Sequence, residues 1–262
     1  MITRRAISQR AISRLVRLLL LALAAGLWAG MAQAHPEDEF CHPGGGVDPA
    51  VCRALAQMDD GARAAEPLLL GRTPFETAGL YALIGIRHIL PGGLDHILFV
   101  LLLVLSMRGA RQLILQLSVF TLAHAVTLGL ATTGVIAPSP DWVEPLIAAT
   151  ILLVAIEVTA LRQPPPWRSA AVFGFGLIHG MGFAGYFGSV GFPDNQFWSA
   201  LIGFNIGVEL GQGVVALVAA GVLALLARVT GRAAYGRYVV RLSAVLIGFV
   251  SLVWLVERLT AS

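Results

Sequence analysis

Lysine is absent from this 262-residue chain, and charged side chains of every kind make up only 13% of it. Soluble globular chains carry roughly 25% charged residues, so the sequence excludes an ordinary water-exposed surface. Only two cysteines are present, which excludes a small domain held together by many disulfides. Hydrophobic residues instead reach 57%, and the mean hydropathy is +0.79. This balance also excludes intrinsic disorder and indicates a membrane protein.

The basic charge is concentrated at the N-terminus. All 18 basic residues are arginines, and five of them lie in residues 1–17, which contain no acid. Elsewhere 13 arginines face 15 acidic residues, so the basic excess belongs to targeting and does not indicate a nucleic-acid partner. An apolar run over 18–31 and the Ala32-Gln33-Ala34 motif complete the pattern of a cleaved signal peptide over 1–34. An uncleaved anchor is the alternative, although the run is shorter than the roughly 20 residues of a membrane span.

Residues 35–74 are polar and acidic, with seven acids against three arginines. We expect them to form a periplasmic head in which Cys41 and Cys52 are joined by a disulfide, because an oxidising compartment favours that pairing. The head has two interpretations. It is either a solvated leader or a surface on which His35, His42 and the nearby acids capture a cation.

Residues 75–262 consist of apolar runs separated by short loops, which predicts an all-α integral membrane domain. Six spans are expected, at 86–106, 112–134, 142–161, 169–189, 197–227 and 239–258. The first, third and fifth loops between them contain arginines, and the second and fourth contain none. By the positive-inside rule the arginine-bearing loops are cytoplasmic, so both ends of the mature chain are predicted to lie outside.

The first span is expected to be broken. Residues 75–90 are also apolar, but Pro91-Gly92-Gly93 would end a helix there. A separate span over 75–90 would invert every later loop, so we interpret it as a half-helix followed by broken backbone and a second helix over 94–107. Irregular backbone inside a membrane needs cover from protein or a polar cavity, and transporters use such breaks at binding sites. A kink without a role is the alternative.

Ionisable side chains inside spans are costly and indicate functional sites. Five fall at a similar predicted depth: Asp95, His96, His124, His179 and Glu209. His88 is predicted to lie a few residues outside this layer, and Glu157 on its cytoplasmic side. Imidazole and carboxylate ligands together suit nickel, cobalt, copper and zinc, so the layer predicts a site for a divalent transition metal. A hydrogen-bonded packing network is the alternative.

The fifth span carries two stripes at helical spacing. Small residues form the first stripe, which suits close packing on a neighbouring helix: Gly203, Gly207 and Gly211. Polar side chains form the second, which could line a path: Asn205, Glu209 and Gln212.

Four sequence blocks resemble the HupE/UreJ family of hydrogenase and urease accessory membrane proteins, more closely its second branch. The blocks are 87–99, 120–128, 173–184 and 205–212, and the resemblance runs over about 79–256. The first block contains the family's G-x-D-H core as Gly93-Leu94-Asp95-His96. Related nickel and cobalt transporters carry H-x4-D-H, whereas six residues separate His88 from Asp95 here, so His88 is expected to be an accessory residue.

The resemblance implies a multi-pass protein of the bacterial inner membrane that supplies nickel or cobalt to metalloenzymes. It makes Asp95, His96, His124, His179 and Glu209 the metal-handling positions. The ligand chemistry of these side chains leaves zinc and copper as further candidate ions. No G-x-x-x-x-G-K-[ST] motif is present, so we expect the energy source to be a partner, the membrane potential or a proton exchange. The sequence does not identify an energising or metallochaperone partner.

The leading hypothesis is a permease that is not an enzyme. One alternative is an intramembrane zinc hydrolase with Glu209 as general base and Ser118 or Thr121 nearby, although H-E-x-x-H is absent. The other is an accessory protein that binds metal without transporting it.

Overall fold

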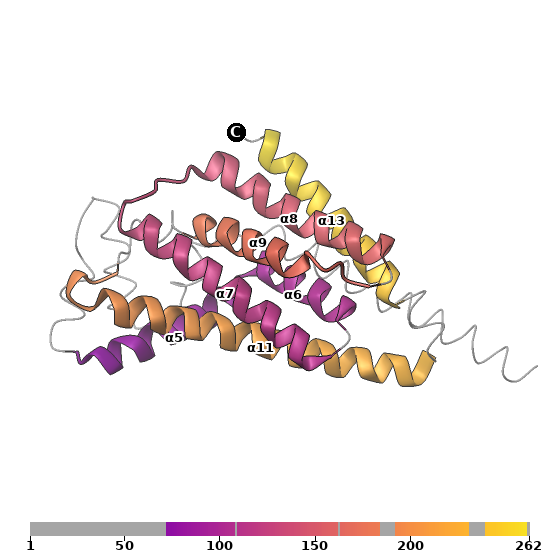
Figure 1. Cartoon of the computed structure of the whole chain (residues 1–262), viewed down its shortest axis with the longest axis horizontal. Coiled ribbons are helices and arrows are strands. Elements are labelled where there is room, and N and C mark those ends of the chain that lie inside the picture. Colours follow the sequence, from indigo (N-terminus) through magenta and orange to yellow (C-terminus); the bar gives the residue numbers. More distant parts are fainter. Residues whose placement is uncertain (1–71, 108, 162, 184–191, 231–238, 261–262) are drawn as a thin grey trace, which may run out of the picture.

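The computed structural model describes residues 72–107, 109–161, 163–183, 192–230 and 239–260 (Figure 1). The helices in these ranges are α5 (Pro74–Ile89), α6 (Leu94–Ser106), α7 (Ala110–Thr132), α8 (Pro140–Ala160), α9 (Arg168–Gly182), the short η2 (Asp194–Gln196), α11 (Phe197–Thr230) and α13 (Arg241–Thr260). The described chain contains no strand, as expected for an all-α protein. The signal peptide, the Cys41–Cys52 pair, His35 and His42 lie outside the described residues and stay predictions.

The predicted break in the first span is confirmed. Helix α5 ends at Ile89, α6 begins at Leu94, and the two helices are bent by 74° relative to each other. The start of α5 is fixed by a capping box, in which the Thr73 side chain accepts from the Glu76 amide and the Glu76 carboxylate accepts from the Thr73 amide. Pro74 occupies the first turn, where its missing N–H costs nothing.

Four described helices are long and apolar enough to cross a membrane: α7, α8, α11 together with η2, and α13. The bent pair α5 and α6 gives a fifth candidate if it counts as one span. Helix α9 has 15 residues, about 22 Å at 1.5 Å per residue, and it is shorter than the hydrocarbon core of about 30 Å. The predicted fourth span continues to residue 189, beyond the described end of α9, so six spans stay a prediction.

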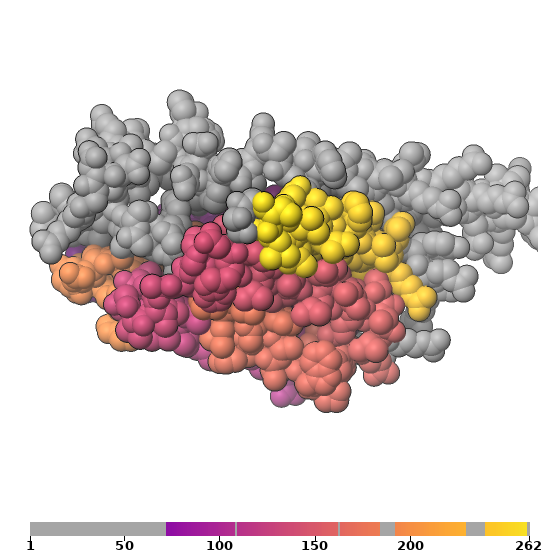
Figure 2. Space-filling model, turned by 90° about the horizontal axis from the view of Figure 1, so that it is seen from above, coloured from indigo at the N-terminus to yellow at the C-terminus, as the bar shows by residue number. Residues whose placement is uncertain are grey.

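The helices pack as pairs around α6. Helix α5 lies along α11, α7 along α9, and α8 along α13, while α6 contacts α11, α8 and α13 (Figure 1). Figure 2 shows α13 lying beside α8 on one face of the molecule. Helix α6 supplies much of the buried core through Leu98, Phe99, Val100, Leu102 and Leu103. In its first turn, His96 is buried inside the bundle, whereas Asp95 is partly exposed.

Close packing of α5 on α11 depends on small residues. A Cβ added at Gly203 would collide with the backbone of Ala78, and one at Gly207 with the backbone of Ala82. In the other direction, a Cβ at Gly85 would collide with the Phe204 carbonyl. The glycine stripe predicted on the fifth span therefore packs directly against the half-helix that leads to the break.

Candidate metal site

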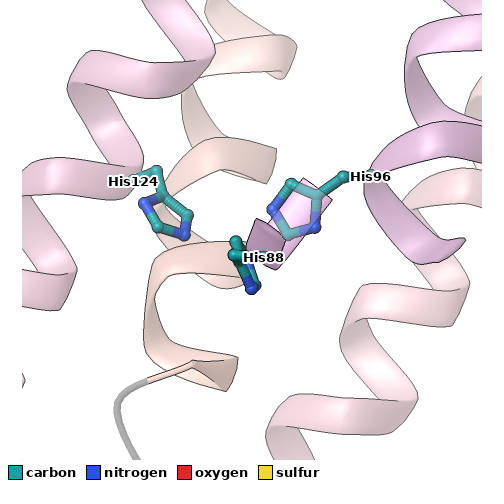
Figure 3. Close-up of side chains that lie close together, drawn as sticks. All are labelled: His88, His96 and His124. Atoms are coloured by element: carbon teal, nitrogen blue, oxygen red, sulfur yellow. The ribbon is translucent and has the colours of Figure 1, made fainter. Parts of the chain in front are cut away.

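Three histidines from three helices form one group (Figure 3). His88 lies in the last turn of α5, His96 in the first turn of α6, and His124 in the middle of α7. One nitrogen from each ring lies within 4.8 Å of the other two. The rings of His88 and His96 are 4.8 Å apart between centroids, and those of His96 and His124 are 5.7 Å apart.

The break between α5 and α6 explains why His88 belongs to this group. The sequence-based prediction placed His88 outside the polar layer because it treated the first span as straight when it assigned depths to the residues. The 74° turn between the helices folds the chain back so that residues 88 and 96 face one another. His88 therefore lies with His96 and His124, in place of the peripheral position expected from the sequence.

The nitrogens of this group are well suited to bind a metal ion. The Nε2 atoms of His88, His96 and His124 are buried and have no hydrogen-bond partner in the described part of the chain. Leaving buried polar atoms unsatisfied costs about 1–3 kcal/mol each, a cost that a bound cation would remove. Neutral imidazole nitrogens are common ligands of zinc, copper, nickel and cobalt. The arrangement can therefore hold a transition-metal ion through three nitrogens.

Asn205 of α11 determines which ring nitrogen of His124 carries the proton. Its side-chain Nδ2 donates to the Leu201 carbonyl at 2.8 Å, which orients the amide so that Oδ1 points to His124 Nδ1 at 3.3 Å. Because Oδ1 only accepts hydrogen bonds, the imidazole proton resides on Nδ1. The lone pair of Nε2 is then available to a metal ion, as in metal sites where a neighbour selects the histidine tautomer.

We expect Asn205→Leu to weaken metal binding by about 10- to 100-fold, the range for residues that orient a metal ligand. The leucine removes the acceptor that selects the His124 tautomer but retains a similar volume. Isothermal titration of the purified protein with nickel ions measures the effect. Asn205→Asp keeps an acceptor and serves as the matched control. Unchanged affinity in a folded Asn205→Leu protein would contradict the assigned role.

His179 of α9 lies beside the group without joining it. Its ring is 5.1 Å from that of His96 between centroids. Thr150 donates its own hydroxyl proton to the Ile147 carbonyl at 2.7 Å, so it accepts from His179 Nε2 at 3.0 Å. His179 Nδ1 is consequently unprotonated, and it is buried without a partner among the described residues. His179 is therefore a neighbouring imidazole that contacts the metal-binding group through His96.

The predicted carboxylates lie apart from the three histidines. Asp95 faces α13, where its carboxylate lies 3.2 Å from Nη2 of Arg258. Glu209 accepts a hydrogen bond of 2.6 Å from Ser118 and lines a groove of about 700 Å³ between α7 and α11. No carboxylate belongs to the histidine group in the described ranges.

Two further polar residues named from the sequence have partners elsewhere. Glu157 forms an ion pair of 2.9 Å with the buried Arg168 at the start of α9. Gln212 is fully buried and accepts from Thr121 at 3.3 Å, so it joins α11 to α7. Both residues contribute to helix packing in the structure.

Sequence reasoning missed one partly buried ion pair altogether, that of Arg258 with Asp95. Arg258 lies at the end of the last apolar run and was not singled out, yet it holds Asp95 and also reaches Glu144. An arginine that ends an apolar run commonly marks only a membrane boundary. Asp95 is the one acidic residue in the predicted first span, and this isolated negative charge was the available sign of a positively charged partner.

A family model described as HupE / UreJ protein matches residues 65–258. The match includes every histidine of the group and all the described helices except the last residues of α13. Neither the curated proteins nor the solved structures contain a match to this chain.

Proposed function

Because the chain belongs to the HupE/UreJ family, we propose that it is a membrane permease for a divalent transition-metal ion, with nickel or cobalt as the favoured cargo. The family is associated with metal handling for hydrogenases and ureases. The observation that carries the proposal is the convergence of three buried imidazoles from α5, α6 and α7. We place the protein in a bacterial inner membrane, with its N-terminus outside after signal cleavage.

The three histidines suit an ion that must bind and leave again. An ion moving into an apolar layer must replace its lost hydration shell. Three imidazoles replace part of it and leave other coordination positions open, as in sites that exchange ligands. A conducting site must attract the ion yet release it, so an incomplete set of neutral ligands favours passage over permanent retention.

The broken first span supports transport as well. The loop between Ile89 and Leu94 lies directly between the two histidines that it brings together. Discontinuous helices at the centre of a bundle are a recurrent feature of transporter binding sites. For energy, the membrane potential supplies about 2.3 kcal/mol per charge at 100 mV, or about 4.6 kcal/mol for a divalent ion moving inward.

A zinc hydrolase with Glu209 as general base would need that carboxylate beside the metal. Glu209 instead binds Ser118 in the groove between α7 and α11, and the histidine group contains no acid among the described residues. This geometry favours a carrier over a hydrolase. A metal-binding accessory protein that does not transport would share the same histidine group, so only a flux measurement separates it from a permease.

The decisive experiment measures nickel and cobalt entry into proteoliposomes that contain the purified full chain. We expect uptake that saturates with metal concentration, exceeds that of protein-free liposomes and discriminates against magnesium, which prefers oxygen ligands. Equilibrium binding is measured on the same preparation. Binding without uptake would overturn the permease in favour of an accessory protein, and absence of both would overturn metal handling by this site.

A further inference from the structure

The histidines of the metal-binding group lie against aromatic side chains. The His88 ring is 3.9 Å from the Phe183 ring between centroids. The His124 ring lies roughly parallel to those of Phe120 and Phe204, with centroid distances of 6.4 and 6.2 Å. Phe120 and Phe204 are completely buried, and Phe183 is 8% exposed. Phenyl rings supply no oxygen or nitrogen ligand, so an ion in this group depends on imidazole nitrogens for its coordination.

No negative charge balances an ion held by these nitrogens. An imidazole binds a metal in its neutral form, and no carboxylate belongs to the group among the described residues. The three acids that the sequence placed in or near this layer contact partners outside the group, in the pairs Asp95–Arg258, Glu157–Arg168 and Glu209–Ser118. The charge of a bound ion is therefore left unbalanced within the described structure.

An unbalanced site discriminates between ions by their charge. The Born cost of moving an ion from water into a low-dielectric interior rises with the square of its charge, so it is about four times larger for a divalent ion than for a monovalent ion of equal size. The attraction between an ion and the dipole of a neutral imidazole rises only in proportion to the charge. Neutral ligands therefore compensate a monovalent ion more completely than a divalent one.

Copper(I) is the monovalent ion that fits these ligands. Imidazole is a suitable ligand for copper, and the filled d shell of copper(I) makes the ion stable with few ligands and without bound water. Potassium carries the same single charge, but proteins replace its hydration shell with oxygen atoms. The nitrogen ligands therefore separate copper(I) from alkali ions, and the missing negative charge separates it from divalent ions.

We propose that His88, His96 and His124 also bind copper(I), and that they bind it more tightly than nickel or cobalt because nothing balances the second charge of a divalent ion. This inference rests on the proposed function, because it concerns the cargo of the same three histidines. It adds a monovalent ion to the divalent ions proposed there.

The test compares the dissociation constants of copper(I) and nickel on the full chain in detergent, with ascorbate and without oxygen. Cys41→Ser and Cys52→Ser are introduced first, because reduced thiols bind copper(I) themselves. Competition with bicinchoninate measures the copper(I) affinity. We expect copper(I) to bind at least about tenfold more tightly than nickel, equivalent to about 1.4 kcal/mol. His88→Ala should weaken the binding of both ions, and His96→Ala repeats this comparison should the first variant not fold.

Asn205→Asp tests whether charge is the cause of the preference. The Asn205 Oδ1 lies 3.3 Å from His124 Nδ1, so the substitution keeps an acceptor there and adds a negative charge behind a ligand. A carboxylate attracts a divalent ion twice as strongly as a monovalent one, so the preference for copper(I) over nickel should shrink about tenfold. Gln112→Glu makes the same change at an exposed position near the start of α7 and should leave the preference unchanged.

The outcomes distinguish this inference from the proposed function. Nickel that binds as tightly as copper(I), or more tightly, would overturn the inference and leave the nickel permease standing. Copper(I) binding that survives both histidine substitutions would also overturn it, because the ion would then lie elsewhere. So would a preference that folded Asn205→Asp protein retains in full. A chain that binds neither ion would overturn the proposed function, and the inference with it.

Discussion

Proteoliposomes containing His96→Ala should take up neither nickel nor cobalt, and the affinity for these ions should fall by more than about 100-fold. His96 is central to the group, since its ring contacts those of His88, His124 and His179. Losing one of three ligands leaves two imidazoles. The resulting fall in affinity should exceed the 10- to 100-fold effect of residues that only orient a ligand. Radioactive metal uptake and equilibrium titration measure the two effects.

His179→Ala provides an informative contrast. Because His179 lies beside the group without contributing to it, we expect a reduction in affinity of about tenfold or less, below the effect of a lost ligand. Ser251→Ala is the matched control for a lost buried polar group, since among the described residues that hydroxyl bonds only to the Ile247 carbonyl of its own helix. If His96→Ala transported normally, or if His179→Ala were the more severe variant, the ligand set would be different.

The second large effect is expected at the interface between α5 and α11. Gly207→Leu places a side chain where even a Cβ collides with the Ala82 backbone. Overpacking lowers the free energy of unfolding by about 1–3 kcal/mol where side chains can move. Here the collision is with backbone atoms, which cannot easily move away, so we expect the free energy of unfolding to fall by at least about 3 kcal/mol. Displacing α5 also moves His88, so nickel binding should be lost together with stability. Thermal unfolding in detergent and nickel titration measure these effects.

Gly213→Leu is the matched control for this substitution. It lies on the same helix, and a Cβ there meets no neighbouring atom within 4 Å. Replacing glycine inside a helix by a good helix former contributes about 1 kcal/mol, so this variant should be at least as stable as wild type. Equal unfolding temperatures for Gly207→Leu and Gly213→Leu would show that the α5–α11 contact is not tight.

Much of the helical framework followed from local features of the sequence. Predicted spans at 112–134 and 142–161 correspond to α7 at Ala110–Thr132 and α8 at Pro140–Ala160. Apolar runs end where prolines, glycines and arginines begin, and these signals act over only a few residues. The break at Pro91 was predictable for the same reason, because a proline lacks an N–H and two glycines follow it directly, whereas the lone Pro145 is accommodated inside α8.

The sequence by itself determined a helical membrane protein with a broken first span and with histidines in its apolar segments. Hydropathy and helix-breaking residues are local properties, so no knowledge of neighbouring helices was needed. Only the tertiary structure decided which polar groups meet. The 74° bend places His88 beside His96. Helix packing pairs Asp95 with Arg258 and brings Ser118 within hydrogen-bond distance of Glu209. Those partners depend on the rotation and crossing of helices, which are set by contacts between residues up to 163 positions apart.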